Sequence, residues 1–140
     1  MFQNFVIKLL EELEIPEDEM SQVEGKMVIE VNKGNPITFT EIPPEGFRVF
    51  SPIGKCPESR QEELFSHVML GNLFGEATSG SVISLDDKTD TLQVHLDVPQ
   101  CVTYAEFYGH IEIFLNTVDF WRSELESHEK ESEARSDLLY

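Results

Sequence analysis

The chain has 140 residues, 40% of them apolar, and 27 acidic residues outnumber 10 basic ones to give a formal charge of −17. This size and apolar content fit one folded domain with its own core and argue against a chain that is disordered throughout. So negative a chain repels phosphate backbones and anionic lipid headgroups, which argues against nucleic acid or a membrane surface as a partner.

The cysteines and the N-terminal segment bear on where the protein works. Cys56 and Cys101 lack the close spacing of a zinc or redox motif, so we expect reduced thiols and no disulfide framework. Acidic residues interrupt the apolar N-terminal segment and no basic region precedes it, so a signal peptide is not expected. No apolar run approaches the length of a membrane span. Together these features predict a cytoplasmic protein.

The first element expected is an amphipathic helix. Its apolar residues recur at the i, i+3, i+4, i+7 spacing of one helix face: Phe2, Phe5, Val6, Leu9, Leu10 and Leu13. Pro16 disfavours helix in the residue before it, so this helix should end near Ile15. An acidic loop over residues 17–25 is predicted to follow.

Five strands and two further helices are expected beyond this loop. Alternating apolar and polar residues predict strands at 27–31, 37–40 and 47–53, whose short connections require an antiparallel meander. A second helix begins near Pro57, and strands at 81–85 and 91–98 flank a turn rich in Asp.

The last helix is predicted to begin after Thr103, which with Glu106 forms a capping-box pattern, and to carry an apolar stripe as far as Leu125. The sequence therefore predicts an α+β domain over residues 1–126, with three helices, an antiparallel twisted sheet of about five strands and the order α-βββ-α-ββ-α. Residues 127–140 lack the apolar period and are expected to form a flexible acidic tail.

No pattern in the sequence fits a catalytic or metal-binding site. His95 and Asp97 share one face of a strand, but solvated positions on an amphipathic strand explain them better than a catalytic pair. Asp86, Asp90 and Asp97 have calcium-loop spacing, yet Lys88 stands where an oxygen ligand is needed. His67 and His110 have no ligand four residues later, and the Gly71–Gly75 segment lacks the lysine of a phosphate loop. We expect no cofactor, no metal and no enzymatic activity.

Apolar residues in unexpected places are the more informative feature. Val28, Phe50 and Ile83 are out of phase with the core-facing residues predicted for their strands, and the second helix is apolar over a wide arc. Register shifts could bury these side chains. If they stay at the surface, apolar patches of this kind indicate contacts with other proteins.

Three segments resemble a known family. The segments 70–75 (LGNLFG) and 80–86 (GSVISLD), together with the last helix from Tyr104 to Arg122, are similar to the class I chaperones of bacterial type III secretion, the Tir-chaperone or CesT-like family. Ser79 stands where many relatives have a glycine. The resemblance covers about residues 2 to 126 and does not include the acidic tail.

The resemblance implies a homodimer that binds the N-terminal region of a secreted effector in extended form, in the bacterial cytoplasm and without chemistry. It implies a dimer interface on the second helix and the strand after it, at Leu64, Val68, Leu73, Phe74, Val82 and Ile83. For the partner, strand alternation favours a groove containing Val28 and Phe50, with Phe5 and Leu9 of the first helix as the other location.

Two other functions stay open at this point. A subunit with the same fold could bind a component of the secretion machine instead of an effector. An enzyme using His95, Asp97 and Cys101 is the remaining alternative, and it would require a base within about 3 Å of its proton donor.

Overall fold

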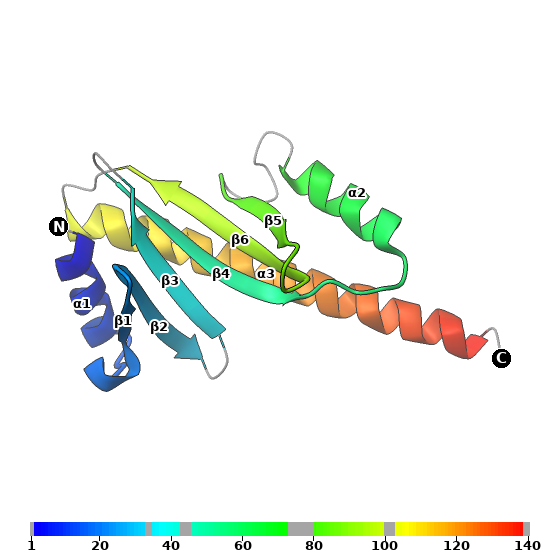
Figure 1. Ribbon diagram of the computed structural model, residues 1–140, viewed down its shortest axis with the longest axis horizontal. Helices are drawn as coiled ribbons and strands as arrows, with labels where there is room; N and C mark the ends of the chain where they lie inside the picture. Colours follow the sequence, from blue (N-terminus) through cyan, green and yellow to red (C-terminus); the bar gives the residue numbers. More distant parts are fainter. Residues whose placement is uncertain (1, 33–34, 43–45, 73–79, 100–102, 139–140) are drawn as a thin grey trace.

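The computed structural model describes residues 2–32, 35–42, 46–72, 80–99 and 103–138. Its helices are α1 (Phe2–Glu12), α2 (Gln61–Asn72) and α3 (Tyr104–Leu138), with a short 3-10 turn at Glu17–Glu19. The strands are β1 (Ser21–Val23), β2 (Lys26–Asn32), β3 (Asn35–Glu41), β4 (Phe47–Lys55), β5 (Val82–Asp86) and β6 (Thr91–Val98). They pair antiparallel in one sheet of order β1-β2-β3-β4-β6-β5 (Figure 1).

The α+β class and the order of elements are confirmed, but the sheet has six strands instead of about five. The additional strand, β1, lies in the segment expected to be an acidic loop. All three of its residues are exposed, so it has no buried face and no apolar alternation that could have predicted it. It pairs with β2 because Glu24 and Gly25 take positive φ values of 51° and 78°, as a two-residue type I′ hairpin turn requires.

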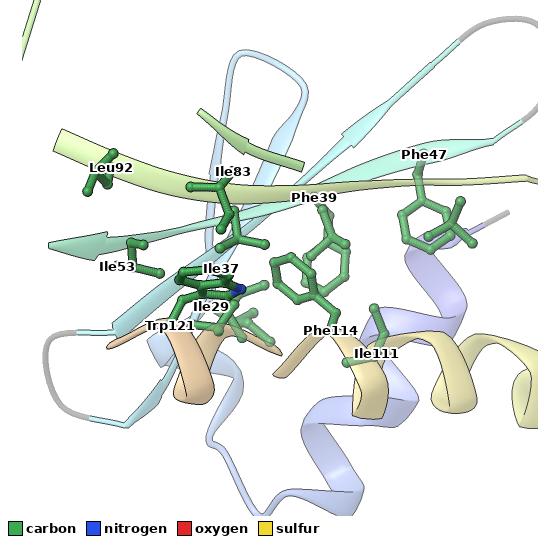
Figure 2. Close-up of a cluster of buried hydrophobic side chains, with 14 of the residues drawn as sticks. Ile29, Ile37, Phe39, Phe47, Ile53, Ile83, Leu92, Ile111, Phe114 and Trp121 are labelled. Atoms are coloured by element: carbon green, nitrogen blue, oxygen red, sulfur yellow. The ribbon is translucent and has the colours of Figure 1, made fainter. Parts of the chain in front are cut away.

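One face of the sheet forms the core against α1 and α3. Figure 2 shows side chains of the sheet, among them Phe39 and Phe47, facing Ile111, Phe114 and Trp121 of α3. The ring centroid of Phe107 lies 5.5 Å from that of Phe47 and 5.4 Å from that of Phe5 on α1. The helical stripe and the alternating strands of the sequence therefore meet in a single aromatic core.

Local signals set the ends of the helices. After α1, Glu14 takes a positive φ of 57°, and the amide of Ile15 donates to the carbonyl of Leu10 at 2.9 Å, which is the Schellman arrangement at a helix end. At the start of α3, the Thr103 hydroxyl accepts a hydrogen bond from the amide of Glu106 at 3.2 Å, as the capping pattern predicts.

The third helix is longer than the sequence suggests. It has 35 residues and continues through the segment expected to be a tail. The part of α3 after residue 126, here called the overhang, contacts the beginning of α2 (Figure 1). His128 is buried, and its Nε2 lies 3.0 Å from the carbonyl oxygen of Ser59. The Arg60 guanidinium also lies within 3.4 Å of the Glu131 carboxylate and of the Ser132 hydroxyl.

Candidate interaction surfaces

The face of the sheet away from α1 and α3 carries a row of paired residues that crosses all six strands. Strand pairing places its members next to one another, and they are here called the open-face row: Ser21, Val28, Thr38, Phe50, His95 and Val82. Their sequence neighbours, such as Met27, Phe39 and Val49, are buried in the core, so alternation turns the row outward. The row is an apolar and weakly polar band with three apolar members.

Exposure along the row is graded. Val82 on the edge strand is 44% exposed, whereas Val28, Phe50 and His95 are half-buried among their cross-strand neighbours. Thr38, between Val28 and Phe50, is only 8% exposed. Thr38 therefore offers little surface, and Val28 and Phe50 on either side of it are the apolar members at the centre of the row.

An ion pair borders the row. Arg48 and Asp97 face each other on β4 and β6, and two guanidinium nitrogens donate to the two carboxylate oxygens at 2.6 Å and 3.0 Å. This pairing lowers the pKa of Asp97. Burial, together with the nearby positive charge of Arg48, lowers the pKa of His95, so its imidazole is neutral near neutral pH.

The residues predicted to bind a partner lie in two different environments. Val28 and Phe50 lie on the open face, where strand alternation puts them. Leu9 is 1% exposed and Phe5 stacks on Phe107, so both belong to the protein's own core. The groove predicted around Phe5 and Leu9 is therefore not available in this conformation.

The residues predicted for a dimer interface are in part buried in the core and in part outside the described residues. Leu64, Val68 and Ile83 are between 4% and 8% exposed and pack in the core. The phase assigned to Ile83 is wrong, because its partner in β6 is Val94 on the core face and the outward residue is Val82. Leu73 and Phe74 lie outside the described residues.

Other apolar side chains of the same two elements are exposed instead. Met69 and Leu70 of α2 are 71% and 68% exposed, and Val82 and Leu85 of β5 are 44% and 41% exposed. Strand alternation puts Val82 on the open face and Leu85, which pairs with the buried Leu92, on the opposite face. Met69, Leu70 and Leu85 are therefore called the α2–β5 patch, since α2 lies beside β5 (Figure 1). The residues predicted for the dimer interface did not include Met69, Leu70 or Leu85. Val68, Met69 and Leu70 are three consecutive apolar residues, which spread over more than half of a helical turn and cannot all face one core, and that signal could have identified Leu70.

The structure describes two of the three residues considered for catalysis, His95 and Asp97. The Asp97 carboxylate is held by Arg48, and Cys101 lies outside the described residues. Burial raises the pKa of the Cys56 thiol, which disfavours the reactive thiolate. Within the described part of the chain, no three His, Cys, Asp or Glu side chains gather as a metal ion would require.

A family model for the Tir chaperone protein (CesT) family matches residues 5–122. The chain belongs to this family. A Chlamydia pneumoniae protein, CPj0713/CpB0740, is 35% identical over 69 residues, which are 49% of this chain and 52% of that relative. The match thus spans about half the length of that relative.

Two solved structures share the CesT-family fold. The HopA1–SchA chaperone–effector complex contains a chain that matches with a TM-score of 0.66 and 13% identity, over 87% of this chain and 93% of that one. A chain of the ExsC–ExsE complex matches with a TM-score of 0.64 and 13% identity, over 86% and 90%. The family model thus shows membership of a chaperone family, and the two solved structures show the shared fold. Within the described residues, no helix has the length and apolar character needed to cross a membrane.

Proposed function

We propose that this CesT-family protein binds the N-terminal region of a secreted effector in extended form in the bacterial cytoplasm and keeps it competent for secretion. The observation that carries this proposal is the open-face row, an apolar band on the side of the sheet away from α1 and α3. An extended chain presents side chains at regular intervals and suits such a band, because contacts with alternate side chains select the sequence of the partner.

Val28 and Phe50 are proposed to make the central contacts with the effector. They flank the small, nearly buried Thr38, so two apolar side chains lie close together at the centre of the row. Each apolar side chain fully buried by a partner contributes about 1.5–3 kcal/mol before ordering costs. The pair can therefore dominate the affinity of a side-chain-mediated complex.

The protein is further proposed to act as a homodimer through the α2–β5 patch. The three exposed apolar side chains would stay in water in a monomer, and apolar groups of this size on adjacent elements favour self-association. An ordinary interface buries about 1,600 Å² in total, so the patch would be the centre of a larger contact.

The experiment that tests effector binding is co-purification from the native host followed by identification of the bound chain. Val28→Asp with Phe50→Asp should reduce the amount of captured effector at least tenfold while the circular dichroism spectrum stays that of the wild type, since both charges would enter an apolar contact.

The matched control is Ile113→Asp with Phe120→Asp, which places two charges at exposed apolar residues of α3, 49% and 47% exposed. This control should bind the effector as the wild type does. Loss of binding in the control alone would locate the contact on α3 and contradict the proposal. Capture of a component of the secretion machine instead of an effector would favour the alternative role.

A further inference from the structure

A second row of paired residues lies beside the open-face row, on the same face of the sheet. It is here called the basic row, and it crosses β1, β2, β3, β4 and β6 through Val23, Lys26, Thr40, Arg48 and Asp97. Each member stands two residues along its strand from a member of the open-face row, a separation of about 7 Å. A chain held on the open-face row can therefore reach the basic row with a long side chain.

Thr40, at the centre of the basic row, has a buried hydroxyl without a partner. Its Oγ1 makes no hydrogen bond to any described residue. Buried hydroxyls are nearly always hydrogen-bonded, because an unpaired one has lost its water without replacement. Strand pairing places Lys26 on one side of Thr40 and Arg48 on the other, with Cβ atoms about 5 Å away. Their long side chains can move aside, so the group of a partner can reach the hydroxyl.

Lys26 gives the basic row its unbalanced positive charge. Arg48 donates to Asp97 through Nε and Nη2, so these two charges balance, and its Nη1 has no partner among the described residues. Lys26 is exposed and forms no ion pair with a described residue. In a chain of formal charge −17, this part of the open face therefore suits one negative charge better than its surroundings do.

We propose that Lys26, Thr40 and Arg48 form a carboxylate-binding site, which holds one acidic side chain of the extended chain bound on the open-face row. The inference rests on the effector binding proposed above and adds a chemical requirement for the partner. The carboxylate accepts hydrogen bonds from the Thr40 hydroxyl and from Nη1 of Arg48, while the ammonium group of Lys26 balances its charge. Because the net charge of the chaperone disfavours acidic partners elsewhere, the site selects a segment with a carboxylate at one position among apolar residues.

The first test needs only the free protein. Thr40→Val removes the unpaired hydroxyl at nearly constant shape, so it should raise the melting temperature. The matched control is Thr91→Val, whose hydroxyl donates to the carbonyl oxygen of Thr89 at 3.3 Å and whose loss should give no such rise. A lower melting temperature for Thr40→Val would show that the hydroxyl is paired in the free protein and would overturn the inference.

The binding test uses synthetic peptides that cover the N-terminal region of the chain captured by the wild type, with each acidic residue replaced in turn by its amide. One replacement should raise the dissociation constant of the wild type by about tenfold, and Thr40→Val or Lys26→Met should do the same for the unmodified peptide. The losses should not add in a double-mutant cycle, because they remove the same contact. Lys88→Met, which removes an exposed lysine in the turn between β5 and β6, should bind as the wild type does.

The results distinguish the carboxylate site from the proposed function. Losses that add, or Thr40→Val and Lys26→Met proteins that bind the unmodified peptide like the wild type, would overturn the carboxylate site and leave effector binding in place. Continued effector capture by Val28→Asp with Phe50→Asp would overturn the open-face contact and the carboxylate site with it. A wild type that captures no effector from the native host would overturn the proposed function and this inference together.

Discussion

Gly54 lies in the irregular part of β4, where the register with β6 shifts between Pro52 and Gly54. Its φ is +153°, and a Cβ atom there would lie 2.6 Å from Cδ2 of Leu125. Leu125 is 5% exposed and has little room to move. The glycine therefore permits both a strained backbone and the close approach of α3 to the sheet.

We expect Gly54→Ala to lower the free energy of unfolding by about 1–3 kcal/mol, because overpacking and an unfavourable φ act together. Gly109→Ala is the control with the opposite sign: this glycine lies in α3 with nothing within 4 Å of the added Cβ, so alanine should stabilise by about 0.5–1 kcal/mol. Urea unfolding of both variants measures the difference. Equal effects would show that α3 does not approach β4 as described.

His95 predicts a pH dependence. Its folded-state pKa is lowered by burial and by Arg48, so unfolding makes protonation easier. The stability that the neutral imidazole contributes is complete above the unfolded-state pKa of about 6.5 and is lost as the pH falls through the lower folded-state value. Between pH 7.5 and 5.5, the melting temperature of His95→Gln should therefore fall by less than that of the wild type. Curves of melting temperature against pH that run parallel for the two proteins would contradict this prediction. Asp97, whose ordinary pKa is 3.8 and is lowered further by Arg48, acts only at more acidic pH.

Among the elements, the overhanging end of α3 depends most on tertiary contacts. Arg60, at the start of α2, has a positive φ of 56°, and its guanidinium reaches His128, Glu131 and Ser132. A side chain anchored in this way can hold its backbone in an unfavourable region. The overhang and the beginning of α2 therefore support each other.

Removal of residues 127–140 should lower the melting temperature by a few degrees, because the buried His128 and the contacts of Arg60 are lost while the main core is untouched. A scan by differential calorimetry measures this. A truncated chain that melts with the wild type would support the dispensable tail that the charge pattern indicates.

How much the sequence predicts differs between elements, and the reason is whether an element has a buried face. α3 up to Leu125 and strand β6 carry strong apolar periods, and their predicted positions agree with the structure. β1 and the overhang of α3 do not, since turn geometry and contacts with Arg60 hold them and neither leaves an apolar pattern. The surfaces show the same dependence on a regular pattern. Strand alternation placed Val28 and Phe50 correctly on the open face. Leu64 and Val68, which were predicted at the dimer interface, are buried in the core, and the exposed residues of α2 are their neighbours Met69 and Leu70.

At the scale of the whole molecule, charge opposes the proposed dimer. Two chains of formal charge −17 repel over distances comparable with the Debye length, which is about 30 Å at 0.01 M salt and about 8 Å at 0.15 M. Association through the uncharged α2–β5 patch should therefore tighten as salt is added, the reverse of an interface built on ion pairs.

We expect light scattering at 0.15 M salt to give twice the chain mass of 16.0 kDa, with dissociation favoured when salt is removed. Met69→Asp with Leu70→Asp should give a monomer at both salt concentrations, since unpaired charges would enter an apolar contact. A dimer that survives this double substitution would locate the interface elsewhere.

The open-face row runs across the strands and not along them, and this direction has a mechanical consequence for any chain held there. Neighbouring strands are about 4.8 Å apart, so a segment following the row touches each strand at one place. Pulling on one end then loads the nearest contact first, and the contacts break one after another. A segment paired lengthwise with a strand would instead resist as a unit, because all its hydrogen bonds share the load. Under the proposed function, the row can hold an effector firmly against thermal release and still let it peel away under a small directed force.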